Sequence, residues 1–143
     1  MTKQEWKARY PSFSIEEVYS PRALRRLNQT GQHIINFEFL DMLQALRNEV
    51  GPIYVNIGQH RRRGVRDPYD NYLIYNKNWN YSFHLAGIAA DISSSKYSVD
   101  ELYPKVKNFR FNNKRFTGIG LYPTWIHVDI RPRTEPGHVF WTG

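Results

Sequence analysis

The segment from Trp125 to Arg131 alternates between polar and apolar side chains, and it constrains the fold more than any other stretch of the chain. Ile126, Val128 and Ile130 fall on one face of an extended strand, because successive side chains in a strand point to opposite sides. The opposite face carries Trp125, His127, Asp129 and Arg131. The pattern predicts a strand that buries one face in a core and keeps the other face for polar chemistry.

A second segment, SFHLAGIAAD from Ser82 to Asp91, supplies further candidate metal ligands. His84 and Asp91 together with His127 make two imidazoles and one carboxylate, a set that zinc accepts in catalytic sites where water takes the fourth position. Gly87 has no side chain and therefore suits backbone packed close to a metal centre. The two segments together predict a metal site on the face of a small sheet.

The spacing Ser-x-His-x-x-Gly-x-Ala-x-Asp in this segment, followed by a strand that holds His127, resembles the zinc D-alanyl-D-alanine carboxypeptidase family. Relatives of that family include phage L-alanyl-D-glutamate endolysins, vancomycin-resistance D,D-dipeptidases and the hedgehog signalling domain. The resemblance extends from about Phe13 to about Trp141, and its flanking sequences are FSIEEVYSP, FLDMLQALRNEVGPIYVNIG and GIGLYPTWIHVDIR. It implies that His84, Asp91 and His127 bind one zinc ion.

The resemblance implies a peptidoglycan peptidase, either a D,D-carboxypeptidase or an L-Ala-D-Glu-type endopeptidase. In such an enzyme zinc activates water and polarises the scissile carbonyl, and a base moves the proton to the leaving amine. Many relatives place an acidic residue three positions before the last histidine, where this chain has Thr124. Threonine cannot take a proton at neutral pH, so either the base comes from elsewhere or the site binds zinc without efficient catalysis.

Asp129 and His60 are the candidate catalytic residues. Asp129 lies on the same strand face as His127, roughly 7 Å along the strand. It can orient a metal-bound imidazole, pair with Arg131, or act as the general base. His60 stands where the resembled family carries a segment that contacts the substrate.

An irregular loop rich in Arg, Asn and Tyr is expected from Gly58 to Tyr81. Long loops inside a compact domain are often functional, although a solvated basic loop has the same composition. In the resembled family an arginine at this position helps to hold the substrate, and an arginine fork can give a peptide carboxylate two hydrogen bonds. We therefore expect substrate contacts from Arg61, Arg63, Ser82 and Tyr122.

The sequence predicts an α+β fold in one compact domain, with N-terminal helices packed on a small antiparallel sheet that carries the zinc site, as in the hedgehog and D,D-peptidase relatives. Residues 1–12 are interpreted as a basic leader and residues 13–143 as the zinc peptidase-like domain. Capping-box patterns and an apolar stripe predict helices from Ile15 and over 23–29, 37–50 and 98–107. The predicted strands are 53–57, a pair within 109–121, 125–131, and a short last strand or coil at 138–141.

Composition narrows the class of protein. The chain has 143 residues, 41% of them hydrophobic, and no cysteine, which suits one cored domain and excludes thiolate zinc sites and disulfides. A net charge of +7 attracts polyanions, but no nucleic-acid-binding motif accompanies the charge, so a nucleic-acid partner is not expected. No apolar run approaches the roughly 20 residues of a membrane span, and no membrane partner is expected.

The expected partner is a peptidoglycan stem peptide, bound by a monomer. No apolar signal core is present near the N-terminus. We therefore expect a soluble protein made in the cytoplasm that acts at the bacterial wall after phage lysis, as an endolysin, or from within a virion. The alternative is a non-catalytic module that binds walls or builds a phage particle and keeps the same fold, with the metal or without it.

Overall fold

Five strands form one mixed sheet in the spatial order β1-β2-β4-β3-β5. The computed structural model describes residues 1–55, 64–66, 83–84, 86–132 and 139–143. The strands are β1 (Ile53–Val55), β2 (Ala89–Ser94), β3 (Gly118–Leu121), β4 (Ile126–Asp129) and β5 (Val139–Thr142). With the helices they make an α+β fold, which confirms the predicted class.

The sheet departs from the predicted antiparallel arrangement at one edge. The pairs β1–β2, β2–β4 and β3–β4 are antiparallel, whereas β3 and β5 are parallel. Strand β4 already has β2 and β3 on its two sides, so the chain that leaves β4 reaches a free edge beyond β3. It runs back antiparallel to β4 and is therefore parallel to β3. The prediction of a purely antiparallel sheet is wrong for this reason.

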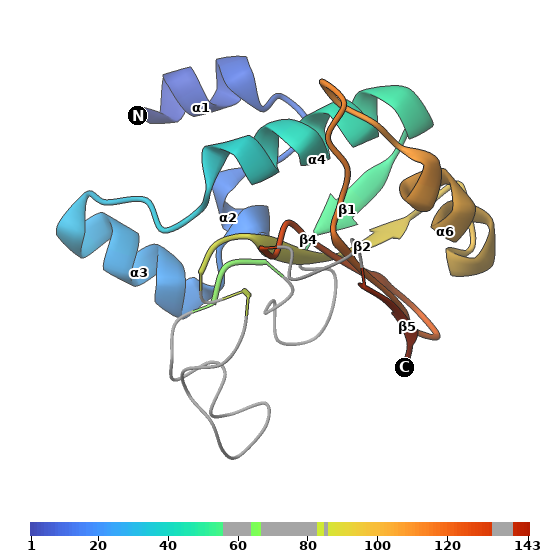
Figure 1. The fold of residues 1–143 in the computed structure, drawn as a ribbon. Coiled ribbons are helices and arrows are strands. Elements are labelled where there is room, and N and C mark those ends of the chain that lie inside the picture. Colours follow the sequence, from blue (N-terminus) through green and yellow to red (C-terminus); the bar gives the residue numbers. More distant parts are fainter. Residues whose placement is uncertain (56–63, 67–82, 85, 133–138) are drawn as a thin grey trace.

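The helices are α1 (Lys3–Arg9), α2 (Ile15–Val18), α3 (Pro21–Thr30), α4 (Phe37–Val50) and α6 (Val99–Asn108). Figure 1 shows α4 running along one side of the sheet, with α1 beyond it. The apolar face of α4 and the inward residues of β2 and β4 share one core, which includes Phe39, Leu43, Ile92, Ile126 and Val128. Among the described residues, no helix combines the length and apolar character needed to span a membrane.

Side-chain caps start the helices where the sequence predicts. Ser14 Oγ accepts a hydrogen bond from the Glu17 backbone N–H at 3.1 Å, and Ser98 forms a capping box with Glu101. Each cap satisfies a backbone donor that the first helical turn leaves without a partner. Glu17 also accepts a hydrogen bond from the Val55 backbone N–H at 2.8 Å, which ties α2 to β1.

The segment interpreted as a basic leader is part of the folded domain. It contains α1, which begins with a capping box between Thr2 and Glu5. Trp6 and Tyr10 are buried in the core, and Tyr10 donates a hydrogen bond from its hydroxyl to Asp41 on α4 at 2.8 Å. Two aromatic side chains therefore attach this basic helix to α4 and to the core.

The expected strand pair within 109–121 is a single strand preceded by a tight turn. Phe111 and Lys114 form an isolated antiparallel bridge, around Asn112 and Asn113, whose φ angles are 52° and 63°. Asparagine tolerates this left-handed region better than most residues. The strand that follows, β3, pairs with β4 and β5 instead of with its own upstream segment.

Gly87 allows two backbone segments to pack closely against each other. Its φ is +70°, and a Cβ at this position would collide with the backbone of Ile34 and Ile35. The Gly87 carbonyl accepts a hydrogen bond from the Asn36 backbone N–H at 2.9 Å. Gly87 therefore lets the turn that carries His84 approach the start of α4.

Replacing Gly87 by alanine is expected to lower the free energy of unfolding by about 1–3 kcal/mol for the left-handed backbone alone, with a further loss from the collision. Gly31→Ala is the matched control, since Gly31 has a φ of +69° but nothing within 4 Å of the position that a Cβ would take. Chemical denaturation with a chelator present measures both variants. Equal losses at the two glycines would show that the close approach to Ile34 contributes nothing.

Candidate metal centre

Three side chains from separate segments converge on the face of the sheet that lies away from the core. His84 sits in the turn before β2, Asp91 is on β2 and His127 is on β4. Asp91 and His127 are direct partners in the β2–β4 register, so their side chains share a face. One ligand atom from each residue lies within 4.8 Å of the others, and this group can hold a metal ion. The structure brings together the set that the sequence predicts.

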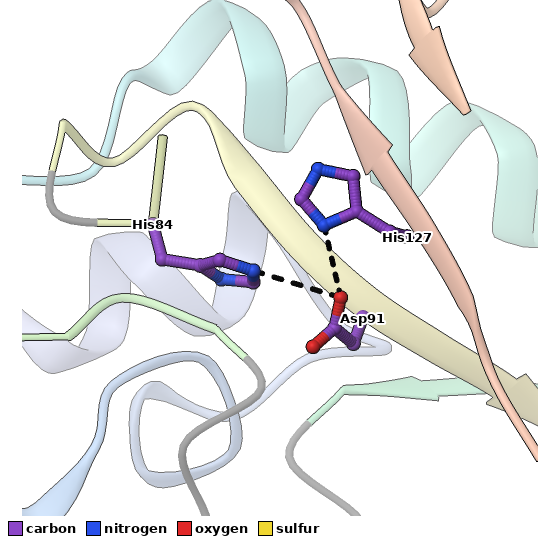
Figure 2. Close-up of side chains that lie close together, drawn as sticks. All are labelled: His84, Asp91 and His127. Carbon is purple, nitrogen blue, oxygen red and sulfur yellow. Dashed lines mark hydrogen bonds and ion pairs between the residues drawn. The ribbon is translucent and has the colours of Figure 1, made fainter. Parts of the chain in front are cut away.

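Asp91 is the centre of the group. Its Oδ1 lies 3.0 Å from His127 Nδ1 and 3.5 Å from His84 Nε2, and Figure 2 shows both imidazoles pointing at this oxygen. Burial would raise the pKa of Asp91, but the two histidines outweigh burial and hold this pKa well below its usual range. The carboxylate is therefore anionic and available to a cation.

The His84 ring is oriented by a backbone carbonyl. Its Nδ1 lies 2.9 Å from the Gly64 carbonyl oxygen, which can only accept, so Nδ1 carries the proton and donates it. This tautomer leaves the lone pair on Nε2, the atom that faces Asp91. Burial lowers the pKa of His84, and this keeps the imidazole neutral as a metal ligand requires.

His127 lies between two carboxylates. Its Nδ1 contacts Asp91, and its Nε2 lies 2.8 Å from Asp129 Oδ2. Burial lowers the pKa of His127, but the hydrogen bonds to Asp129 and Asp91 outweigh burial and raise it overall. A metal ion held by His127 would replace the proton on Nδ1, while Asp129 keeps the proton on Nε2 and fixes the ring orientation.

Asp129 is fully buried and held by Arg131. The Arg131 guanidinium donates from Nε to Oδ1 at 2.9 Å and from Nη2 to Oδ2 at 2.6 Å, and the Arg131 backbone N–H donates to Oδ1 at 3.0 Å. Burial would raise the pKa of Asp129, but the hydrogen bonds from His127 and Arg131 lower it to about 2. A Cβ on Gly118 would collide with this carboxylate, so the absence of a side chain there makes room for it. These contacts match the orienting role for Asp129 and its pairing with Arg131.

Arg66 is a residue of the site that the sequence interpretation missed. Its Nη2 lies 3.6 Å from Asp91 Oδ2, and the residue is only 5% exposed. Backbone hydrogen bonds of Val65 with Val18 and Ser20 fix the short described segment that holds it. The sequence signal was the run of four arginines from 61 to 66, but composition alone does not tell which arginine points inward.

The expected substrate residue Tyr122 lies beside the site in an aromatic cluster. Its ring stacks on Trp125 with centroids 4.8 Å apart, and its hydroxyl accepts a hydrogen bond from Trp141 Nε1 at 3.0 Å. Thr124, three residues before His127, is exposed, and its carbonyl accepts a hydrogen bond from the Ser93 hydroxyl. The other expected site residues lie outside the described residues: His60, Arg61, Arg63 and Ser82.

Comparison with known proteins gives no match among family models, curated proteins or solved structures. The functional conclusion therefore depends on the site itself. The site is a buried His-Asp-His group that can hold a metal ion, in an α+β domain with a five-stranded mixed sheet.

Proposed function

We propose that the protein is a zinc-dependent peptidoglycan peptidase that hydrolyses a stem-peptide amide, as a D,D-carboxypeptidase or an L-Ala-D-Glu-type endopeptidase. The observation that carries the proposal is the convergence of His84, Asp91 and His127 within 4.8 Å. Three protein ligands of this kind leave a fourth position for water in catalytic zinc sites. When bound, zinc supplies a Lewis acid that polarises the amide carbonyl and activates water.

The protein's own residues have separate tasks in this proposal. His84 and His127 are held in fixed orientations by the Gly64 carbonyl and by Asp129, so the two ligand nitrogens already point into the site before a metal arrives. Arg66 places a positive charge beside Asp91. An arginine fork suits a peptide carboxylate, and we include Arg66 with Arg61 and Arg63 as candidates for holding the substrate. Tyr122 would line the adjacent aromatic wall.

The net charge of +7 supports a wall substrate, because bacterial walls are rich in anionic groups. In this proposal the protein reaches the wall after phage lysis, as an endolysin, or is carried in a virion. The charge favours encounter with the wall, whereas the metal site determines the chemistry.

Zymography on purified bacterial walls tests the proposal. The wild-type protein is expected to clear the wall layer, to lose this activity in chelator, and to regain it with added zinc. His127→Ala is the catalytic-site control, and His33→Ala, outside the metal centre, is expected to remain active. Absence of chelator-sensitive clearing on every wall type would contradict the peptidase assignment.

Zinc and iron are to be quantified in the same preparation, since two histidines and one carboxylate also form the ligand set of Fe(II) oxygenases. One equivalent of zinc is expected. One equivalent of iron with no zinc would redirect the proposal away from hydrolysis.

The second candidate function is a non-catalytic wall-binding or structural phage module. Two observations favour it. Position 124 has no acidic side chain, and Asp129, the acidic residue nearest to His127 in sequence, is fully buried and paired with Arg131. Such a protein would bind walls in a pull-down as tightly as an active enzyme. Wall binding without release of new amino groups, in a zinc-loaded sample, would select this function over the peptidase.

A further inference from the structure

Trp141 on the edge strand β5 lies in the same cross-strand row as the candidate metal ligands. Asp91 pairs with His127, His127 pairs with Gly120, and Gly120 pairs with Trp141. Residues paired across neighbouring strands present their side chains on the same face of the sheet. Gly120 contributes no side chain to this row, and a Cβ there would collide with the indole. The indole therefore crosses Gly120 and reaches the His127 ring, with centroids 5.3 Å apart.

The indole is held by two further groups. Its Nε1 donates to the Tyr122 hydroxyl at 3.0 Å. The Arg131 guanidinium lies over two aromatic rings, 4.9 Å from the Trp141 centroid and 4.5 Å from the Phe83 centroid. Arg131 is also the partner of Asp129, which contacts His127 Nε2. His127 is thus restrained at its Nε2 edge by Asp129 and beside its ring by Trp141, and Arg131 connects the two restraints.

The strand that carries this indole is short and partly exposed. Strand β5 is four residues long and lies at the end of the sheet order, beside β3. Val139 and Phe140 are 48% and 38% exposed, so a large part of each side chain stays in contact with water. Backbone hydrogen bonds from Val139 to Thr117 and from Gly143 to Leu121 attach its ends. Segments of this kind open at low free-energy cost. When β5 detaches from the sheet, the contact between Trp141 and His127 is lost.

We propose that Trp141 is a positioning residue for His127, and that docking of β5 and metal binding stabilise each other. The inference rests on the metal-binding part of the proposed function and does not require peptidase activity. An imidazole restrained before binding loses less conformational freedom when the metal arrives. Coupling between two events is reciprocal, so the factor by which the docked indole raises metal affinity equals the factor by which metal suppresses opening of β5.

Zinc alone is the probe for the first half of the test, in competition with a chromophoric chelator. Trp141→Ala is expected to weaken zinc binding about 10-fold, at the lower end of the range for residues that orient metal ligands. Trp141→Phe keeps a ring and is expected to recover part of the affinity. Phe140→Ala is the matched control, because it removes an aromatic ring from the neighbouring position of β5, which faces the other side of the sheet. Its zinc affinity is expected to stay within about twofold of wild type, inside the usual additivity error for independent sites.

Gly120→Ala perturbs the same contact from β3. The added methyl group displaces the indole without removing it, and zinc affinity is expected to fall. In the Trp141→Ala background the displaced group is already gone, so Gly120→Ala is expected to have no further effect. This non-additivity separates a specific contact from two unrelated disturbances.

Hydrogen exchange measures the other half of the coupling. Zinc is expected to slow hydrogen exchange of the Val139 and Gly143 amides in wild type and in Phe140→Ala. The expected factor is roughly 10-fold, because it equals the factor by which Trp141 raises zinc affinity. This extra protection is expected to vanish in Trp141→Ala.

If the Trp141→Ala variant does not fold, the zinc affinities of Trp141→Phe and Gly120→Ala test the proposal instead. A wild-type protein that binds no zinc would overturn both the metal-centre proposal and this inference. Normal zinc affinity in Trp141→Ala, or additive effects with Gly120→Ala, would overturn this inference alone.

Discussion

The double variant His84→Ala/His127→Ala is expected to bind no stoichiometric zinc and to show no thermal stabilisation by zinc. It removes both nitrogen ligands and leaves Asp91 as the one remaining ligand of the group. In wild type, zinc held by the folded state alone stabilises it by about 4 kcal/mol when free zinc exceeds the dissociation constant 1,000-fold. For a chain of this length that corresponds to a rise in Tm of roughly 10–15 °C. Elemental analysis and thermal melts with zinc or chelator measure the two effects.

His33→Ala is the control for this experiment. His33 stacks on Trp6 with centroids 5.5 Å apart and contacts the Tyr19 hydroxyl at 2.9 Å, so it belongs to the packing of α1 and not to the metal centre. Its loss is expected to lower Tm while the rise in Tm caused by zinc is retained. One equivalent of zinc in the double variant would contradict the ligand assignment.

Features governed by nearby residues were predictable from the sequence. Helix α4 has the predicted bounds, because Asn36 caps its first turn and Gly51, with a φ of +93°, ends it. Two of the three candidate ligands were predictable for a similar reason, whereas His84 was expected from the motif that resembles the carboxypeptidase family. Alternation in 125–131 places His127 on the outward face of β4, and Asp91 has the same parity on β2. These patterns depend on residues only two to four positions apart.

Features governed by tertiary position were not predictable in this way. The parallel placement of β5 depends on which sheet edge remains free after β4 is enclosed. Arg66 reaches Asp91 because Val65 is bonded to the α2–α3 junction, and the four arginines of the sequence look alike without that contact. Trp6 lies in a segment whose composition indicates a polar leader, although its side chain packs into a core formed by residues much later in the chain.

Asp129→Asn is expected to weaken zinc binding by about 10–100-fold, the range for partners that orient a metal-bound histidine. Without metal it is also expected to lower the free energy of unfolding by about 3 kcal/mol, because Arg131 loses the partner of a buried ion pair. Asp100→Asn is the control, since Asp100 is exposed in the first turn of α6. Metal titration and denaturation in chelator give the two quantities.

The stability difference between wild type and Asp129→Asn is expected to depend on pH. The folded-state pKa of Asp129 is about 2, below the ordinary aspartate value of 3.8, so the folded state binds this proton less tightly than the unfolded state. The corresponding stabilisation, about 2 kcal/mol, is present above pH 4 and is lost as the pH falls through 2. Denaturation curves from pH 7 down to pH 2 are expected to show the two proteins converging at the acidic end.

The zinc dependence of activity separates the two remaining roles of Asp129. A general base acts on the reacting proton, so its loss would lower turnover by about 10²–10⁴-fold while zinc affinity stays unchanged. An orienting residue acts through His127, so its loss would lower zinc affinity, and added zinc would restore activity. The carboxylate has no exposed surface and accepts hydrogen bonds from both His127 and Arg131, which leaves it poorly placed to reach a substrate proton. We therefore expect rescue by zinc. A variant that stays inactive at saturating zinc would assign Asp129 as the base, and one with normal affinity and activity would exclude both roles.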